Sequence, residues 1–383
     1  MSRLADVVRS LTVARSDGPA LISLYVDLDP GVVPTARDVE AHGAALVDQA
    51  ERLGDARSES ASHAEEMELR EATARIRAFL VDDLDRTGAH GVALFVSGPD
   101  TWREVRLPGA VEEAVHVGGS FVVAPLLPFV ERDREVVLAV VGRDVGTIWR
   151  TEDGRVSEVK DLSRHGQGWH DQGGWSQARY QRGIEVEARE HMRNVADVLA
   201  HLVRPGSETL LAVGCLEERR TEFEGLLAQH VRKALIGWVD YDARADGDEL
   251  RPGIERLLDD HLRSERDALL ERWHEERGQE SGRATMGWTE TLEAAADAAV
   301  DVLLVDGTTA DAYECPSCGR GYVEPGACPL DSTPLQEALG GALELALRLT
   351  LGHKGEVRWA PDEIDGGAIA LLRFPLRTPS YTP

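Results

Sequence analysis

Short runs of continuous apolar residues recur along the chain, and longer segments with apolar residues at helical spacing separate them. Runs of about four to eight apolar residues predict buried strands, and the spacing i, i+3, i+4 predicts amphipathic helices. The predicted strands lie at residues 21–28, 91–96, 136–141, 146–149, 209–214, 236–239, 302–305, 356–359 and 368–374. Because strands alternate with helices along the whole chain, the pattern predicts an α/β fold built in layers.

The length of 383 residues corresponds to roughly two or three domains of ordinary size. We expect an N-terminal α/β domain at residues 1–131, a central domain at residues 132–281 and a C-terminal α/β domain at residues 282–383. Beyond the amphipathic N-terminus, helices are predicted at residues 35–53, 62–87, 176–202, 223–233, 250–278, 288–299 and 335–351.

The charge of the chain excludes one class of function. Asp and Glu number 68 against 42 Lys and Arg, which gives a net charge of -26. Phosphate affinity comes from Lys and Arg, so this balance argues against a nonspecific nucleic-acid binder and against DNA as a partner. No stretch approaches the ~20 apolar residues that span a bilayer, and the N-terminus lacks the apolar core of a signal peptide. We therefore expect a cytoplasmic protein with no membrane partner.

The most informative segment is a polar, glycine-rich loop at residues 163–177, which ends where a long helix is predicted. Gly173 and Gly174 permit close backbone approaches that a Cβ forbids. Trp175 has one N–H donor and no acceptor, and its ring stacks well on bases. Alone, a glycine pair before a helix is a weak signal, and Ser176 would serve equally well as a helix N-cap.

The residues that follow make this segment more specific. After Ser176 come Arg179, Tyr180 and Arg182, spaced as Arg-aromatic-x-Arg. This register resembles the archaeal and eukaryotic class-one peptide-release factors, in which Gly-Gly-Gln precedes Ser and Arg-Phe-x-Arg at the start of a long helix. The chain is therefore similar to a bacterial branch of that superfamily, which also includes pelota-type rescue factors and Vms-type peptidyl-tRNA hydrolases.

The resemblance implies three α/β domains of release-factor or pelota type, the third with a small zinc-ribbon-like insertion. It places Gly173, Gly174 and Trp175 at the catalytic Gly-Gly-Gln, with Trp where the family has Gln. In the family, the backbone N–H after the glycines stabilises the developing oxyanion. That N–H remains here, and Gln177 is the candidate to supply the missing amide side chain, with Gln172 a weaker one.

The start of the predicted helix is less acidic than the rest of the chain. Residues 164–204 hold six Arg and five acidic residues. Ser176, Arg179 and Arg182 are therefore candidates to contact RNA phosphates. The alternative is that Arg182 simply pairs with Glu185 and its neighbours on a solvated helix face.

Three of the four cysteines lie close together and predict a metal site. Cys315 and Cys318 form a Cys-x-x-Cys half-site, and Cys328 with Asp331 resembles a second half with Asp in the fourth place. Zinc accepts thiolate sulfur and carboxylate oxygen in a tetrahedron, so the sequence predicts a structural zinc site. The alternative is a degenerate ribbon held by packing. Cys215 stands alone in an apolar run and is expected to be buried.

Several family motifs are absent. The Asn-Ile-Lys-Ser and tyrosine-cysteine motifs with which class-one release factors read stop codons do not occur, and neither does a phosphate-binding Gly-x-x-x-x-Gly-Lys loop. The resemblance then implies a translation factor that enters the ribosomal A site, contacts rRNA and peptidyl-tRNA, and does not decode stop codons. It leaves open whether a translational GTPase delivers the chain.

Three functions remain open at this point. The first is peptidyl-tRNA hydrolysis in ribosome rescue, which makes the chain an enzyme that uses the backbone at residues 173–175 and Gln177. The second is occupancy without chemistry, as in a hibernation or protection factor, with Trp175 among the RNA bases. The third is a stress-response interaction protein that no longer binds the ribosome.

Overall fold

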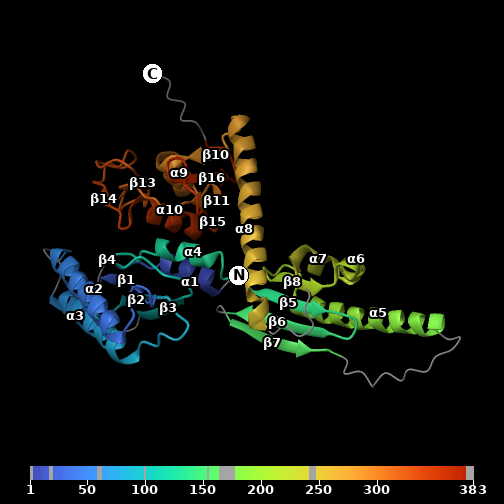
Figure 1. Ribbon diagram of the computed structural model, residues 1–383. Helices are drawn as coiled ribbons and strands as arrows, with labels where there is room; N and C mark the ends of the chain where they lie inside the picture. The colour runs from blue at the N-terminus through green and yellow to red at the C-terminus, as the bar shows by residue number, and fades with distance from the viewer. Residues whose placement is uncertain are drawn as a thin grey trace. The chain divides into compact units, whose positions relative to one another are not determined.

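The computed structural model describes residues 3–16, 20–57, 63–98, 101–152, 155–163, 177–240 and 247–376. The chain packs into two compact units, each described here by itself (Figure 1). The central unit comprises residues 1–3 and 132–265, and the terminal unit comprises residues 4–131 and 266–383. Both units combine sheets with helices, which confirms the predicted α/β class.

An antiparallel sheet in the order β3-β2-β1-β4 forms the N-terminal part of the terminal unit. Its strands are β1 (Leu21–Asp27), β2 (Gly91–Ser97), β3 (Thr101–Leu107) and β4 (Ala114–Gly118). The central strands β1 and β2 are buried on both faces, which explains their continuous apolar runs. The edge strands β3 and β4 are only partly buried, so they lack such a run and the sequence did not predict them.

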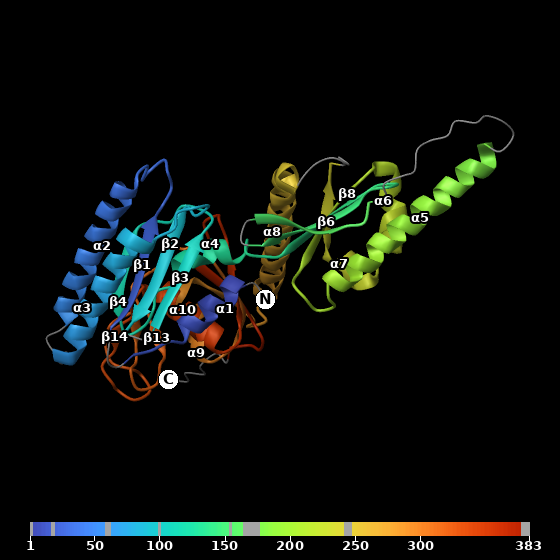
Figure 2. The same ribbon diagram turned by 90° about the horizontal axis from the view of Figure 1, so that it is seen from below.

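Helices cover both faces of this sheet (Figure 2). They are α1 (Arg3–Thr12), α2 (Ala36–Arg57), α3 (His63–Ala78), a π-helical turn (Phe79–Asp83), a 3-10 turn (Ala124–Leu126) and α4 (Leu127–Val130). The predicted helix at residues 62–87 was too long. Regular α-helix ends at Ala78, and Leu84 already has extended backbone.

The C-terminal part of the terminal unit is a four-stranded sheet in the order β10-β16-β11-β15. Its strands are β10 (Ala284–Met286), β11 (Val300–Val305), β15 (Glu356–Trp359) and β16 (Ala368–Leu372), with helices α9 (Gly287–Ala296) and α10 (Gly341–Gly352). Only the β11–β15 pair is parallel in this sheet.

A small three-stranded sheet, β13-β12-β14, lies between β11 and α10 in the chain. Its strands are β12 (Tyr313–Glu314), β13 (Gly321–Tyr322) and β14 (Gln336–Glu337). The helix predicted from residue 335 begins only at Gly341, so that prediction was wrong at its start. Gln336 and Glu337 pair with β12 instead, and Gly340 and Gly341 have left-handed backbone before the helix.

The two sheets of the terminal unit share one hydrophobic core. Tyr25 and Phe95 of the first sheet belong to the same buried cluster as Leu292 and Leu347 of α9 and α10. The segment after β4 joins them, because its backbone amides at Val123 and Ala124 donate to Glu344 Oε2 at 2.9 and 3.0 Å.

Two side chains of β1 hold the same segment from the other side. Tyr25 donates its hydroxyl to the carbonyl of Val122 at 2.6 Å, and the amide of Val122 donates to Ser23 Oγ at 2.9 Å. Tyr25, Ser23 and Glu344 are all buried. Residues 122–124 are therefore fixed by polar contacts from both halves of the unit.

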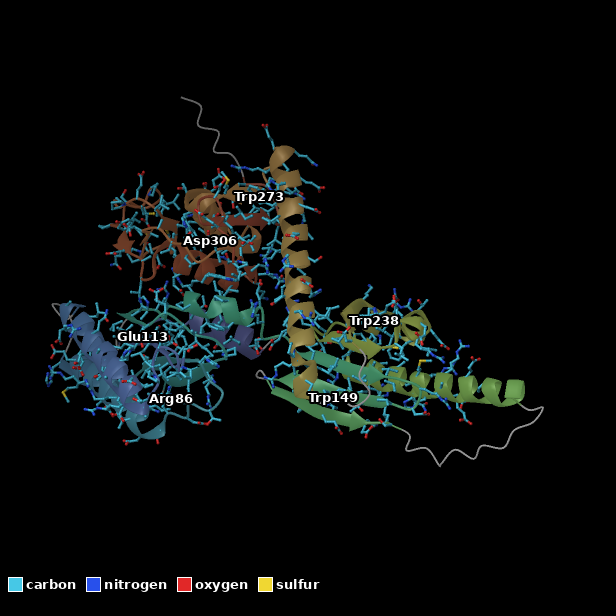
Figure 3. All side chains as sticks on the ribbon, in the orientation of Figure 1. Arg86, Glu113, Trp149, Trp238, Trp273 and Asp306 are labelled. Atoms are coloured by element: carbon cyan, nitrogen blue, oxygen red, sulfur yellow. The ribbon has the colours of Figure 1, made fainter. Side chains whose placement is uncertain are left out.

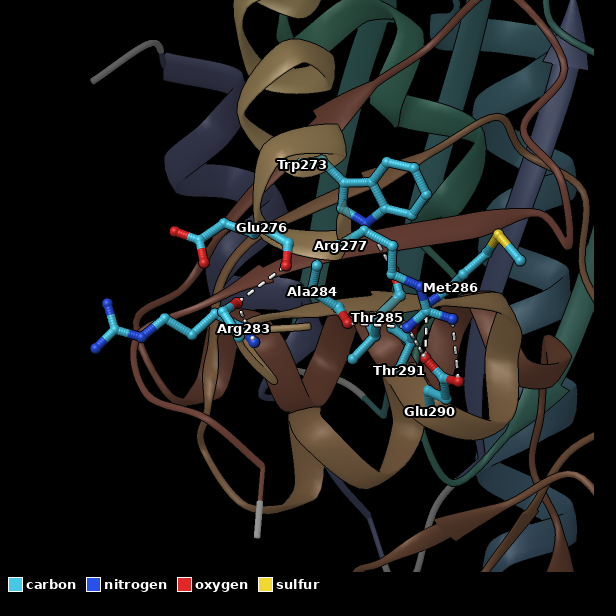
Figure 4. A network of polar contacts seen from close by, with 10 residues as sticks. Trp273, Glu276, Arg277, Arg283, Ala284, Thr285, Met286, Glu290 and Thr291 are labelled. Carbon is cyan, nitrogen blue, oxygen red and sulfur yellow. Dashed lines mark hydrogen bonds and ion pairs between the residues drawn. The ribbon is translucent and has the colours of Figure 1, made fainter. Parts of the chain in front are cut away.

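The last turns of α8 (Gly247–Gly278) pack on β10 (Figure 4). Trp273 is buried there and donates its indole N–H to the carbonyl of Thr285 at 2.9 Å. Arg277 donates to the carbonyl of Ala284 at 3.2 Å and to Glu290 at 3.0 Å. Residues 266–278 of the helix thus belong to the terminal unit, while the earlier turns belong to the central unit.

The central unit is a five-stranded sheet in the order β7-β6-β5-β8-β9. Its elements are β5 (Val136–Val141), β6 (Gly146–Glu152), β7 (Arg155–Asp161), α5 (Gln177–Leu202), β8 (Leu210–Cys215), α6 (Glu217–Leu226), α7 (Gln229–Ala234) and β9 (Leu235–Val239). β5, β6 and β7 form an antiparallel meander, and β5, β8 and β9 are parallel.

Helices also cover both faces of the central sheet. Helices α5, α6 and α7 bury one face, and on the other face Trp149 (Figure 3) packs with Leu250 and Ile254 of α8. Strand β9, predicted at residues 236–239, is an edge strand. The single helix predicted at residues 223–233 is instead two, because Leu227 and Ala228 have extended backbone between α6 and α7.

The three-domain division at residues 131 and 281 stays a prediction. Among the described residues, none of the helices has the length and apolar character needed to cross a membrane.

Glu344 makes the stability of the terminal unit depend on pH. Burial raises the pKa of its carboxyl from the ordinary 4.5 to about 7, against the opposing effect of the two amide donors. A carboxyl with a raised pKa in the folded state contributes stability below about pH 4.5 that is lost as the pH rises through about 7. Glu344→Gln keeps an acceptor for both amides and never ionises. Relative to the wild type, it should gain up to about 3 kcal/mol between about pH 5 and pH 8 in chemical denaturation.

Glu337→Gln, at an exposed position of β14, is the control for this comparison and should show no such trend. Parallel stability curves for wild type and Glu344→Gln across the same pH range would show that folding does not raise the pKa of Glu344.

Trp273→Phe tests the attachment of α8 to β10. The substitution keeps an aromatic ring but leaves the buried carbonyl of Thr285 without its donor, which should cost about 1–3 kcal/mol of unfolding free energy. Arg272→Ala, on the exposed side of the same turn, should change it by less than about 1 kcal/mol. Equal effects of the two substitutions in thermal denaturation would contradict the role assigned to the indole hydrogen bond.

Candidate functional site

The segment with the glycine pair ends at the N-terminus of α5. Gly173, Gly174, Trp175 and Ser176 lie outside the described residues, as does Gln172. Gln177 is the first residue of α5, and Arg179 and Arg182 follow in its first two turns. The structure describes the backbone of these three residues but not their side chains. The long helix predicted after the glycines is confirmed.

Helix α5 extends past the sheet at its N-terminal end (Figure 2). Among its described side chains, Glu185, Val186 and Glu187 are exposed, and Ala188 is the first buried residue. From there the helix packs on the sheet through Ala188, His191, Met192, Val195, Ala196 and Leu199. At about 1.5 Å rise per residue, Gln177 lies about 16 Å along the helix from Ala188. The glycine segment is therefore attached to a helix end that lies well away from the core.

The predicted metal ligands come together in two matching turns. In the first, the amide of Gly319 donates to the carbonyl of Cys315 at 2.8 Å. In the second, the amide of Ser332 donates to the carbonyl of Cys328 at the same distance. Gly319 and Ser332 both have left-handed backbone, with φ of 73° and 60°. Asp331 thus occupies the position in its turn that Cys318 occupies in the first.

The four ligand atoms have the spacing of a tetrahedral site. The Sγ atoms of Cys318 and Cys328 are 3.7 Å apart, and Cys315 Sγ is 3.7 Å from both carboxylate oxygens of Asp331. All four ligand atoms lie within 4.8 Å of one another. A Zn–S bond of about 2.3 Å places two tetrahedral sulfurs about 3.8 Å apart, so these residues fit a zinc ion.

Hydrogen bonds prepare two of these residues as ligands. The amide of Thr333 donates to Asp331 Oδ1 at 3.0 Å and holds the pKa of that carboxyl well below its usual range, so Asp331 is ionised at neutral pH. Burial raises the pKa of Tyr322, which keeps its hydroxyl protonated 3.6 Å from Cys328 Sγ. Tyr322 is therefore placed to donate a hydrogen bond to the Cys328 thiolate, a role that its position in the sequence gives no means to predict.

Ion pairs hold the first turn against the rest of the terminal unit. Glu314, directly before Cys315, accepts two hydrogen bonds from Arg348 of α10, at 3.0 and 2.7 Å. Arg15 donates to both oxygens of the same carboxylate, at 3.1 and 3.0 Å. Arg320, in the same turn, pairs with Asp297 after α9. The ligand turns are thus connected to α10, to α9 and to the segment after α1.

The fourth cysteine has a different setting. Cys215 ends β8, is buried in the core under α5 and α6, and is not part of the metal cluster. Burial raises its thiol pKa to about 11, so the reactive thiolate is scarce at neutral pH. The expectation of a buried apolar residue is confirmed.

Comparison with known proteins agrees with the motif at residues 173–182. A sequence model of the family described as bacterial archaeo-eukaryotic release factor family 10 matches residues 122–261. That segment contains Gly173, Gly174, Trp175 and all of α5. Peptide chain release factor subunit 1 of Methanosphaera stadtmanae is 24% identical over 330 residues, 75% of this chain and 79% of that relative.

The chain is similar to the bacterial branch of the archaeo-eukaryotic release-factor superfamily. The same-named factor of Archaeoglobus fulgidus is 24% identical to this chain over 289 residues, 68% of this chain and 70% of that relative. Among solved structures, Dom34 of S. cerevisiae, described as a translation termination-like factor, has a TM-score of 0.43 and 9% identity, covering 78% of this chain and 83% of that one.

Asp331 is the residue that distinguishes a candidate four-ligand site from a three-cysteine cluster. Asp331→Ala should weaken zinc binding by about tenfold or more in competition with a chelator, because the fourth protein ligand is lost. Asp331→Cys should bind at least as tightly as the wild type, since the two turns have matching backbone. Glu324→Ala, an exposed acid of the same segment, is the control. Equal zinc affinity in Asp331→Ala and the wild type would show that Asp331 is not a ligand.

Proposed function

We propose that the chain is a ribosome-associated translation factor that enters the A site and places residues 173–177 at the peptidyl-transferase centre. The observation that supports this most directly is the family match, since it spans both the Gly173-Gly174 motif and α5. The N-terminal end of α5 supports it physically, because a segment joined to a helix end that extends past the sheet is able to reach into a narrow RNA cavity.

Peptidyl-tRNA hydrolysis in ribosome rescue is the reaction that we propose for these residues. The two glycines allow close approach to the ester, and the backbone N–H of residue 175 is available to the developing oxyanion. Gln177, at the first position of α5, is the proposed source of the amide side chain that helps position water. Ser176, Arg179 and Arg182 are proposed to contact rRNA phosphates.

One residue favours a second function, in which the chain occupies the site without chemistry. Trp175 stands where the family has its Gln, and an indole donates one hydrogen bond and accepts none. It cannot accept a hydrogen bond from a water molecule, but it stacks on bases at about 1–3 kcal/mol per base. A hibernation or protection factor would need only that stacking and the shape of the loop.

The net charge of -26 is the observation behind a third candidate, a stress-response interaction protein that does not bind the ribosome. Electrostatic attraction to rRNA is strongest at low salt. A chain that fails to sediment with ribosomes at low ionic strength would therefore fit this candidate and contradict the other two.

We propose that Cys315, Cys318, Cys328 and Asp331 hold a structural zinc ion. Protein side chains would fill all four positions, so no coordination site would remain for water or substrate. The metal would supply folding energy to a segment with only two-residue strands. A translational GTPase is the proposed delivery partner, a point that the superfamily resemblance itself leaves open.

A peptidyl-tRNA release assay on purified ribosome complexes separates hydrolysis from occupancy. If the chain is a hydrolase, Gln177→Ala should lower the release rate by about tenfold or more, as loss of a positioned polar group does in acyl transfer. If it is an occupancy factor, the wild type should sediment with ribosomes without releasing peptide, and Trp175→Ala should weaken that binding. Asn194→Ala, an exposed position later on α5, is the control for both. Absence of both binding and release would contradict the proposal.

A further inference from the structure

Gly146, the first residue of β6, is tied to the segment that leaves β7. Its amide donates to Ser163 Oγ at 3.2 Å, and the amide of Leu162 donates to its carbonyl at 2.8 Å. Asp161 adds a further contact, because its Oδ1 accepts the amide of Ser163 at 2.8 Å. Ser163, the last described residue before residue 164, is thus held at Gly146.

The helix that follows residues 164–176 meets the same glycine. A Cβ added to Gly146 would lie 2.9 Å from His191 Nε2 and 2.9 Å from Val195 Cγ2, both on α5. A Cβ does not come this close to other heavy atoms, so a residue larger than glycine would force these two buried side chains, and α5 with them, to shift. The φ of Gly146 lies outside the left-handed region, so close packing alone requires the glycine.

His191 is unusual for a residue at a helix–sheet contact. Its side chain is 1% exposed, and its Nε2 has no hydrogen-bond partner among the residues that the structure describes. A buried polar atom without a partner costs about 1–3 kcal/mol, which an aliphatic side chain would avoid. The flat imidazole ring lies against a backbone position that has no Cβ. The presence of an imidazole at this buried position is therefore explained by its packing against Gly146 and not by a hydrogen bond.

We propose that Gly146, Ser163 and His191 form a loop anchor that ties the end of β7 to α5 on the sheet and so sets the direction in which the N-terminal turns of α5 leave it. This inference rests on the function proposed for residues 173–177. His191 is a positioning residue in this account, since it is buried and acts through the helix. Gly146, at the start of β6, and Ser163, after the end of β7, are also positioning residues and act from the sheet.

A small tilt of α5 at the anchor would move its N-terminal end by a large distance, because the helix is long. Gln177 is 14 residues before His191, which is about 21 Å along the helix at about 1.5 Å per residue. A tilt of about 5° at His191 would move the start of α5 by about 2 Å. Since a misplacement of about 1 Å can cost about a hundredfold in rate, a small repacking at Gly146 should matter at the reacting end.

The test compares Gly146→Ala, His191→Ala and the double variant with wild type. In the free protein, amide hydrogen exchange in peptides covering residues 155–163 and 177–187 should be faster in each single variant. The double variant should be less perturbed than the two single effects combined, because removing the ring makes room for the added Cβ. Gly225→Ala, on α6 with open space around the new Cβ, is the matched control and should leave these peptides unchanged.

In the release assay, Gly146→Ala should lower kcat by about tenfold or more while the concentration for half-maximal ribosome binding changes by less than about threefold. A merely structural role would instead lower the fraction of folded protein and leave kcat per folded molecule unchanged. Unchanged exchange in Gly146→Ala, or simple additivity in the double variant, would overturn the anchor. If the wild type releases no peptide, the hydrolytic function fails, and the exchange measurements still decide on the anchor.

Discussion

The buried contacts of residues 122–124 are the constraint on which the terminal unit depends. Glu344 of α10 reaches back 221 residues in sequence to accept the amide of Val123, while Tyr25 and Ser23 bind Val122 from β1. Burying a carboxyl is costly, and here two backbone donors offset part of that cost. The result is that the first and last parts of the chain share one core, and that core includes α10, which Arg348 connects to the metal-ligand turns.

The central unit depends on close packing instead of buried polar contacts. Helix α5 packs on one face of its sheet. The contact that positions this helix is between Gly146 and the buried ring of His191, not between charged groups. Close packing makes this contact sensitive to volume, because a Cβ at Gly146 would force His191 and Val195 of α5 to shift. A rigid base of this kind suits a helix whose N-terminal turns extend beyond the sheet and carry the residues proposed to act on peptidyl-tRNA.

Much of the fold could be predicted from the sequence, for reasons that particular elements show. β1, β2, β5 and β8 are buried on both faces, so each is a continuous apolar run that is visible in the sequence. Edge strands β3 and β4 are only partly buried and leave no such run. The break between α6 and α7 depends on two extended residues, neither of them Gly or Pro. The shared core was also hidden, because an apolar pattern shows that a face is buried but not which face covers it.

In the candidate sites too, some residues could be predicted from the sequence and others could not. Cys315, Cys318, Cys328 and Asp331 could be chosen by local spacing, whereas Tyr322 and Glu314 support them through contacts that spacing does not show. The contact of Gly146 with His191 joins residues that are distant in sequence, so it could not be predicted either.

The most direct test of the proposed function is to place a photo-crosslinking amino acid at position 175 and map its crosslinks on purified ribosomes. We predict crosslinks to rRNA at the peptidyl-transferase centre; crosslinks only to ribosomal proteins, to the small subunit or to nothing would contradict it.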